Sequence, residues 1–240
     1  MLKKSIPSRE VVSSKYDEIY SIYGELRDSN AFYQWVLSKL NPKPGFHLLD
    51  VACGEGHLLR FANEMGLHPI GIDLSYIATK TANRVVGNNI ALVSDGEYLP
   101  FPNQTFDYVT NLGSLEHFVS PERGLAEMGR VLKPDGWIAI VLPNSYYLLD
   151  ILWHVWRRGY PVSHRQIIER FATAGEWRDL IQANSLVVSR AYKYNMRFPH
   201  SLEDWRWYWR TPQKMLFFIL SPLTPFNLSY SFLYICRRAN

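Results

Sequence analysis

The residues that could do chemistry begin with a small-residue turn at 52–56, which reads ACGEG, and with an acid, Asp73, that ends the next apolar run. Glycine lets the backbone turn sharply and lets a ligand approach the amide groups at a helix N-terminus, where the helix dipole favours negative charge. The distance from this turn to Asp73 fits one βαβ unit, whose second strand presents a carboxylate to the hydroxyls of a ribose. We therefore expect Asp73 to hold a ribose at the end of a strand.

Alternating strands and helices must position these residues. Apolar runs predict strands at 46–51, 69–73, 90–94, 106–111 and 137–142, and helical spacing predicts helices at 58–65, 76–86 and 121–132 between them. Ser75 can cap the second of these helices, and the segment 133–136 reads as a turn. This order predicts an α/β fold with a doubly wound, mostly parallel sheet, in which ligands bind at the carboxyl ends of the strands.

The flanking segments predict further elements. Apolar and aromatic residues at helical spacing between 11 and 40 predict two helices ahead of the first strand. Residues 144–172 predict an amphipathic helix that ends at Gly159, and Thr173 with Glu176 has the spacing of a capping box for a helix at 174–183. Two more strands are expected at 186–194 and 229–236.

The segment 195–228 is the least typical part of the chain. Ser201 and Asp204 can cap a short helix that carries three aromatic residues on one side, Trp205, Tyr208 and Trp209. A second helix, at 212–220, is apolar on most sides. It must bury against the domain as a lid over the acceptor, against a second subunit, or against a membrane surface.

The blocks DVACGEG, GIDLS, SDGEYLPFPNQTFDYV and LKPDGWIAIVLPN occur in the order and spacing of class I S-adenosylmethionine-dependent methyltransferases. The chain resembles this family over about residues 45–143, and its pattern is most similar to the quinone-biosynthesis type, a type 11 small-molecule methyltransferase. The resemblance implies a Rossmann-like sheet of seven strands whose seventh runs antiparallel, with S-adenosylmethionine as the cofactor.

The resemblance also implies the residues that bind this cofactor. In relatives an acid and a glycine at the positions of Asp95 and Gly96 meet the adenine, and a residue at Leu74 packs on its face. Asn111 and Leu112 would hold the methionine part. The full set of expected cofactor-binding residues is Tyr16, Asp50, Ala52, Cys53, Gly54, Asp73, Leu74, Asp95, Gly96, Asn111 and Leu112.

Several of these residues have a plainer alternative. Tyr16 with Asp17 lies over the cofactor in the resembled family, and Tyr20 or Tyr23 could cover the methyl-transfer site, but simple helix packing would also explain these tyrosines. Asp95 would serve equally well as a turn residue before glycine.

The acceptor side is expected near Glu116 and His117, which follow the fourth strand. His117 could act as a general base, because an unperturbed imidazole titrates near neutrality, but a base is needed only for an acceptor that is protonated. The alternative is a histidine that merely begins a helix. His154 and His164 lie near enough in sequence to reach an acceptor and are otherwise surface or packing residues.

The two parts of the chain differ in charge. Residues 1–150 hold 13 Lys and Arg against 17 Asp and Glu, a net −4, whereas residues 151–240 hold 13 against 5, a net +8. The second part also holds Trp153, Trp156, Trp177, Trp205, Trp207 and Trp209. This composition suggests an anionic or amphipathic partner, or else a solvated basic face over an aromatic core. No nucleic-acid motif accompanies it.

We expect one domain over 1–240, with an N-terminal helical cap at 1–44, a cofactor-binding core at 45–143 and acceptor-side insertions at 144–172 and 195–228. Two cysteines offer neither a disulfide framework nor metal-ligand spacing, the N-terminus does not read as a signal peptide, and no eighteen apolar residues run together. These features favour the cytoplasm, with peripheral membrane contact through 205–226.

Three functions remain open from the sequence. The first is methyl transfer to a small, apolar or aromatic acceptor. The second is lipid modification of the fatty-acid cyclopropane synthase type, which the segment 111–118 (NLGSLEHF) resembles. That family's aromatic residue in the glycine loop is replaced by His57 or absent here. The third is a cofactor-binding protein without transfer activity.

Overall fold

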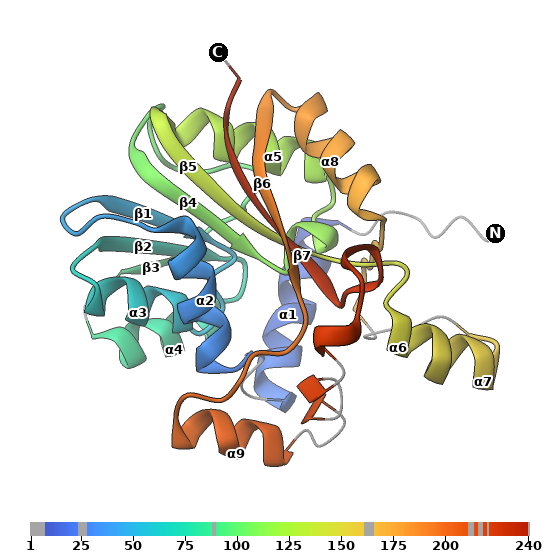
Figure 1. Ribbon diagram of the computed structural model, residues 1–240. Helices are drawn as coiled ribbons and strands as arrows, with labels where there is room; N and C mark the ends of the chain where they lie inside the picture. Colours follow the sequence, from blue (N-terminus) through green and yellow to red (C-terminus); the bar gives the residue numbers. More distant parts are fainter. Residues whose placement is uncertain are drawn as a thin grey trace.

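Seven strands form one sheet in the order β3-β2-β1-β4-β5-β7-β6 (Figure 1). The computed structural model describes residues 8–23, 28–87, 90–160, 166–210, 214–215, 218–219 and 221–239. The strands are β1 (His47–Val51), β2 (His68–Asp73), β3 (Ala91–Val93), β4 (Phe106–Leu112), β5 (Leu132–Pro143), β6 (Leu186–Tyr194) and β7 (Ser231–Arg238). The main helices are α1 (Arg9–Tyr23), α2 (Asn30–Leu40), α3 (His57–Glu64), α4 (Tyr76–Val86), α5 (Pro121–Val131), α8 (Ala174–Ala183) and α9 (Leu202–Arg210).

The sheet is parallel from β3 to β5, and β7 lies antiparallel between β5 and β6. Parallel neighbours need crossover connections, which α3, α4 and α5 supply. The predicted doubly wound sheet with an antiparallel seventh strand is therefore confirmed.

Helices cover both faces of the sheet, and successive strand residues contribute to opposite faces. Leu48 packs with α2 and α3, whereas Leu49 packs with α5 and α8. In the same way, Ile138 belongs to the cluster with α5 and α8, and Ala139 belongs to the cluster with α2 and α3. Side chains alternate along a strand, so a strand buried on both faces must be apolar at nearly every position, as β5 is from 138 to 142.

The turn expected at 133–136 lies inside β5 instead. Phe106 pairs with Leu132 and Tyr108 pairs with Trp137, so the intervening residues bulge out of the ladder. Gly136 permits this close approach, because a Cβ there would lie 2.8 Å from the carbonyl oxygen of Asp107. The seventh strand also begins two residues later than predicted, at Ser231.

Helix α1 is fastened across the carboxyl edge of the sheet. Ser13 donates to the carbonyl of Leu74 (3.0 Å), and Asp17 accepts from the hydroxyl of Ser75 (2.5 Å) and from the amide of Ile77 (3.3 Å). Asp17 thus lies at the N-terminus of α4, where the helix dipole stabilises a carboxylate. This attachment places the adjoining face of α1 over the strand ends.

Helix α9 docks through a different face from the one expected. Trp207 and Tyr208 are buried, whereas Trp205 and Trp209 are exposed. Asp204 is buried with its oxygens satisfied. It accepts from the amide of Ala31, in the first turn of α2, and from the hydroxyl of Ser201. Its role in joining two helices could not be predicted from the spacing within one.

Residues 148–158 form one continuous helical segment, made of α6 (Leu148–Asp150), a π-helical turn (Ile151–Val155) and α7 (Trp156–Arg158). It ends at Gly159, which is left-handed with φ of 71°, as predicted. The helix expected at 212–220 lies largely outside the described residues. Over the described part of the chain, we find no helix with the length and apolarity needed to cross a bilayer.

Candidate active site

A cavity of about 210 Å³ opens at the carboxyl edge of the sheet, beneath α1. The residues predicted from sequence that line it are Tyr16, Asp50, Ala52, Cys53, Gly54, Asp73, Leu74, Asp95, Gly96, Leu112 and His117. They come from five parts of the chain: α1 and the segments that end β1, β2, β3 and β4. The last four converge because parallel strands end at a common edge.

The glycine loop brings bare backbone to this cavity. Gly54 is left-handed, with φ of 52°, and a Cβ there would lie 2.8 Å from the hydroxyl oxygen of Tyr20. Ala52 is also left-handed, with φ of 61°, a conformation that is strained for a residue with a side chain. The chain therefore keeps the sharp bend at the end of β1 although position 52 is alanine rather than glycine.

Asp73 ends β2 beside this loop, and it is 7% exposed. One carboxylate oxygen accepts from the amide of Gly54 and the other from the amide of Ser75, both at 2.9 Å. Each oxygen keeps a second lone pair for a ligand hydroxyl. Burial raises the pKa of Asp73 to about 6, and the two amide bonds oppose that rise.

Asp50 lies in β1, one residue before the strand ends at Val51. It accepts from the hydroxyl of Thr110 at 2.6 Å, and burial raises its pKa to about 7. Asp50 lines the cavity, so a ligand donor there would favour the ionised form.

Asp95 and Gly96 follow β3 at the far side of the cavity. Nε of Arg9 lies 2.8 Å from a carboxylate oxygen of Asp95, and the same guanidinium reaches buried Glu97 at 3.2 Å. Gly96 has no room for a side chain, because a Cβ would lie 2.6 Å from the ring of Phe118. Arg9 therefore screens the acid that was expected to meet an adenine amino group.

Tyr16 and Tyr20 of α1 both line the cavity. The hydroxyl of Tyr16 donates to the side-chain oxygen of Gln166 at 2.9 Å, so α1 and the segment after β5 meet above the cavity. Burial raises the pKa of both hydroxyls, and nearby carboxylates raise it further. Both phenols thus stay protonated and can donate hydrogen bonds. Tyr23's side chain lies outside what the structure describes.

His117 lines the cavity on the acceptor side. Its Nδ1 lies 2.6 Å from the carbonyl oxygen of Ile168, so Nδ1 carries the hydrogen and, in a neutral ring, Nε2 is an acceptor. Nε2 lies 3.7 Å from a carboxylate oxygen of Glu116. Burial raises the pKa of Glu116 to about 8, so its carboxyl keeps a proton at neutral pH beside the imidazole.

Two predicted residues are not among those that line the cavity. Asn111 is fully buried, and its side chain donates to the carbonyl of Val51 and accepts from the amide of Leu115. Of the two contacts expected with the methionine part, by backbone or by side-chain amide, this leaves the backbone contact. Glu116 lies behind His117. His154 lies on the 148–158 helix, and His164 lies outside the described residues.

Replacing Glu116 with glutamine tests its buried state. Between about pH 4.5 and pH 8 the folded chain keeps a proton on Glu116 that the unfolded chain has lost, so this residue makes stability fall as pH rises. We therefore expect the stability of E116Q relative to the unaltered protein to rise by ~1 kcal/mol or more from pH 5 to pH 9. This corresponds to roughly 2–4 °C in Tm. Thermal melts at both pH values check this. An equal difference at the two pH values would contradict it.

Some cavity residues were not predicted from the sequence. Arg9 and Val12 lie on the same face of α1 as Tyr16 and Tyr20, and this helical spacing is the signal that could have found them. Oε2 of Glu55 and Nε2 of His57 lie 3.6 Å apart, and neither atom has a hydrogen-bond partner among the described residues. Gln166 carries no local signal, because only tertiary folding brings it to α1.

The cavity is lined by more acids than bases among the described residues. Asp50, Glu55, Asp73, Asp95 and Glu97 line it, against the single guanidinium of Arg9. Electrostatic interactions are stronger in a buried site of low dielectric. This excess of acidic side chains therefore favours a ligand that carries positive charge.

Comparison with known proteins relates this chain to methyltransferases. Residues 49–140 match the family model described as a methyltransferase domain. The ubiquinone/menaquinone biosynthesis C-methyltransferase UbiE of Burkholderia vietnamiensis is 32% identical over 142 residues, which cover 54% of this chain and 56% of that protein. An uncharacterized protein of Methanocaldococcus jannaschii is 32% identical over 146 residues, covering 59% of this chain and 54% of its own. The chain thus spans about half the length of the curated relatives it matches.

Solved structures match the fold over nearly the whole chain. The geranyl diphosphate C-methyltransferase of Streptomyces coelicolor has a TM-score of 0.66 at 16% identity and covers 97% of this chain and 98% of its own. The 4+2 cyclase SpnF has a TM-score of 0.68 at 19% identity, with 97% of each chain covered. The fold is that of the class I methyltransferases. Within it, residues 49–140 match the methyltransferase-domain model, and the matched relatives include proteins named as UbiE-type methyltransferases.

Proposed function

We propose that this protein binds S-adenosylmethionine in the cavity and transfers its methyl group to a small, apolar or aromatic acceptor. One observation carries the proposal: an acid-rich cavity joins the open backbone of Gly54 to the hydroxyl-accepting carboxylate of Asp73. A sulfonium nucleoside presents the complementary chemistry, since it combines positive charge with two ribose hydroxyls.

The residues present fit this cofactor. Asp73 would accept the ribose hydroxyls, Asp95 and Gly96 would meet the adenine, and Leu74 would pack on it. Gly54 leaves the space that a side chain would fill. The remaining members of the predicted set that line the cavity, Tyr16, Asp50, Ala52, Cys53 and Leu112, would complete the wall.

When bound, S-adenosylmethionine supplies a methyl group that is already activated by its positive sulfur. The chain's own part is then to align the acceptor and to exclude water, and alignment alone supplies much of the rate. Tyr16 and Tyr20 cover the cavity from α1, and Nε2 of His117 can receive a proton from an acceptor that carries one.

The residues that line the cavity indicate the class of acceptor. Tyr16, Tyr20, Tyr33 and Phe118 give the cavity an aromatic lining, which suits a flat or apolar molecule. Relatives named for quinone biosynthesis and for geranyl diphosphate methylation support the same class.

The proposal is tested in two steps with purified protein. Calorimetric titration with S-adenosylmethionine measures cofactor binding, and transfer of a labelled methyl group to quinone, lipid and RNA extracts measures activity. Binding with label recovered in the quinone fraction is the expected result. Absence of binding would overturn the proposal.

His117→Ala separates catalysis from cofactor binding. If the acceptor loses a proton during transfer, we expect the rate to fall by roughly 10²-fold, a typical contribution of general-base catalysis, with cofactor affinity changed less than about threefold. Single-turnover transfer and calorimetry check the two quantities. An unchanged rate would mean that the acceptor needs no base.

A lipid acceptor is the second candidate. It is favoured by the buried carboxyl beside His117 within the 111–118 segment that resembles fatty-acid cyclopropane synthases. Label recovered in the lipid fraction would select it. Cofactor binding without transfer to any extract would instead favour a protein of this fold without methyltransferase activity, and one structure with the same fold is named a cyclase.

A further inference from the structure

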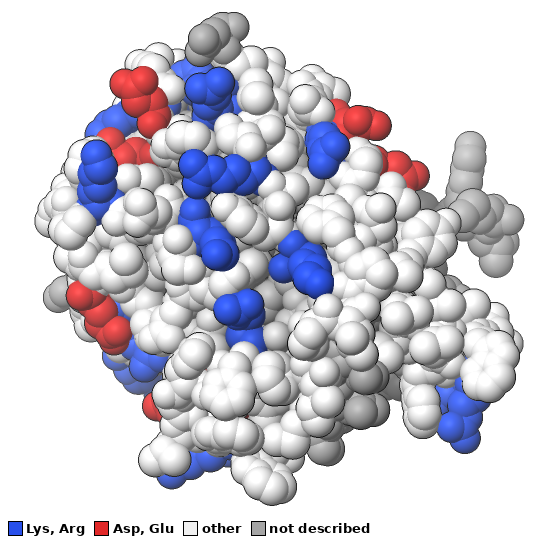
Figure 2. All heavy atoms as spheres, in the orientation of Figure 1, with Lys and Arg blue, Asp and Glu red and all other residues white. Residues whose placement is uncertain are grey.

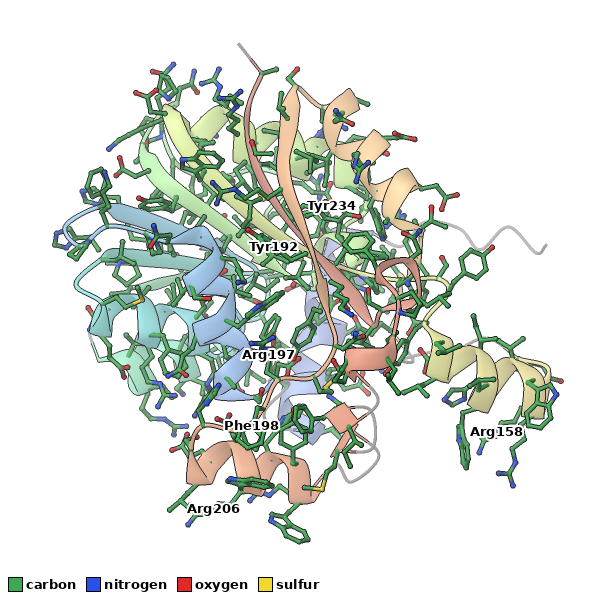
Figure 3. The ribbon with its side chains drawn as sticks, viewed as in Figure 1. Arg158, Tyr192, Arg197, Phe198, Arg206 and Tyr234 are labelled. Carbon is green, nitrogen blue, oxygen red and sulfur yellow. The ribbon has the colours of Figure 1, made fainter. Side chains whose placement is uncertain are left out.

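The helical segment 148–158 packs little against the protein core. None of its residues is buried, although it contains Leu152, Trp153, Val155 and Trp156. Trp156 is 83% exposed and Trp153 is 53% exposed. Figure 1 shows the segment projecting from the body of the molecule, and Figure 3 shows Arg158 at its outer end. A helix of this length is marginal in water without a packing partner, so the segment requires one.

The side chains of this segment combine two chemistries. Leu152, Val155 and Trp156 lie at helical spacing on one face, while the guanidinium of Arg157 lies 4.9 Å from the ring centre of Trp153. Arg158 and the exposed ring of Tyr160 follow. Tryptophan and tyrosine rings prefer the boundary between headgroups and acyl chains, and arginine attracts anionic headgroups.

We propose that residues 148–160 dock on the surface of an anionic lipid bilayer, with Trp153 and Trp156 inserted at the headgroup boundary. Anionic lipid complements Arg157 and Arg158, which outweigh Asp150 within 148–160, and it complements the wider region 151–240, whose net charge is +8. On the face shown in Figure 2, Lys and Arg side chains gather near the centre and Asp and Glu lie toward the margins.

A second copy of the chain is a poorer occupant. A symmetric pair formed through this segment would bring Arg157 and Arg158 of each copy toward the same surface patch on the other. Like charges at a shared interface are unfavourable, whereas a bilayer that contains phosphatidylglycerol neutralises them.

This placement differs from the membrane contact expected at 205–226. In α9 the ring of Trp207 is buried with Tyr208 and Met196 in a separate hydrophobic cluster, so this tryptophan already has a partner within the chain. Trp209 is 74% exposed but lies on the opposite side from that buried cluster. It therefore supplies a matched control.

Vesicle binding tests the proposal on the full chain without cofactor or acceptor. We expect the protein to co-sediment with phosphatidylcholine vesicles that contain about 30% phosphatidylglycerol, and to bind pure phosphatidylcholine at least tenfold more weakly. Trp153→Ser with Trp156→Ser should weaken binding to the anionic vesicles at least tenfold, whereas Trp209→Ser should change it less than twofold. Arg157→Gln with Arg158→Gln should reduce the preference for anionic lipid.

The result is independent of the proposed function, because no step of methyl transfer is measured. All four replaced side chains of 153–158 are exposed, and circular dichroism melts establish that each variant is folded. Equal binding by the double tryptophan variant and the unaltered protein would overturn the proposal. So would a dimer in sedimentation that this variant abolishes, since that result would make a second copy the occupant.

Discussion

Asp73→Ala is expected to weaken the binding of S-adenosylmethionine at least tenfold, equivalent to ~1.4 kcal/mol. The carboxylate would lose its contacts to the ribose hydroxyls. The amide of Gly54, which donates to it at 2.9 Å, would also lose its partner beside the ligand. The first loss acts on the cofactor-bound state alone, whereas the second acts on the free and the bound protein alike, so calorimetry measures mainly the first.

Two companion variants sharpen this test. Asp73→Asn keeps one acceptor oxygen and should fall between the original protein and Asp73→Ala. Asp107→Ala removes an acid that accepts from the amide of His47 and from Lys133 outside the cavity, so it should leave affinity within twofold. Asp73→Ala with unchanged affinity would remove the ribose assignment.

Gly54→Val is expected to reduce cofactor affinity below detection, at least about 100-fold or ~2.8 kcal/mol. Gly54 has φ of 52°, and its missing Cβ would lie 2.8 Å from the hydroxyl of Tyr20. A branched side chain would therefore occupy the space between the loop and α1, where a ligand must pass. Equilibrium dialysis with labelled cofactor extends the measurable range.

Backbone strain is the confounding effect in this experiment, and Gly45→Val controls for it. Gly45 is also left-handed, with φ of 80°, but a Cβ there would meet nothing within 4 Å, and Gly45 does not line the cavity. Both variants should lose ~1–3 kcal/mol of folding stability. Only Gly54→Val should lose binding, and comparable losses in both would make obstruction the wrong explanation.

Much of the core could be predicted because its signals are local. Ser75 begins α4 by accepting from the amide of Ala78, and Thr173 with Glu176 forms the expected capping box of α8. The apolar run of β5 required helices on both faces of the sheet. The loops around Asp73 and Gly96 then converge because parallel strands share one carboxyl edge.

The parts that could not be predicted depend on contacts distant in sequence. Asp204 is held by α2, Asn111 is held by β1, and Gln166 reaches Tyr16 across 150 positions. Arg9 pairs with Asp95 only after α1 has docked on the sheet. No periodicity or spacing within a segment encodes such pairs.

The position of β7 has a consequence for how this chain matures. β6 pairs with β7 and with no other described strand, and β7 is the last of these seven strands in the sequence. Until then, both β5 and β6 present bare edges during synthesis, and such edges invite pairing with other nascent chains. Closure of the sheet thus waits for the synthesis of β7, and the two edges stay unpaired until then.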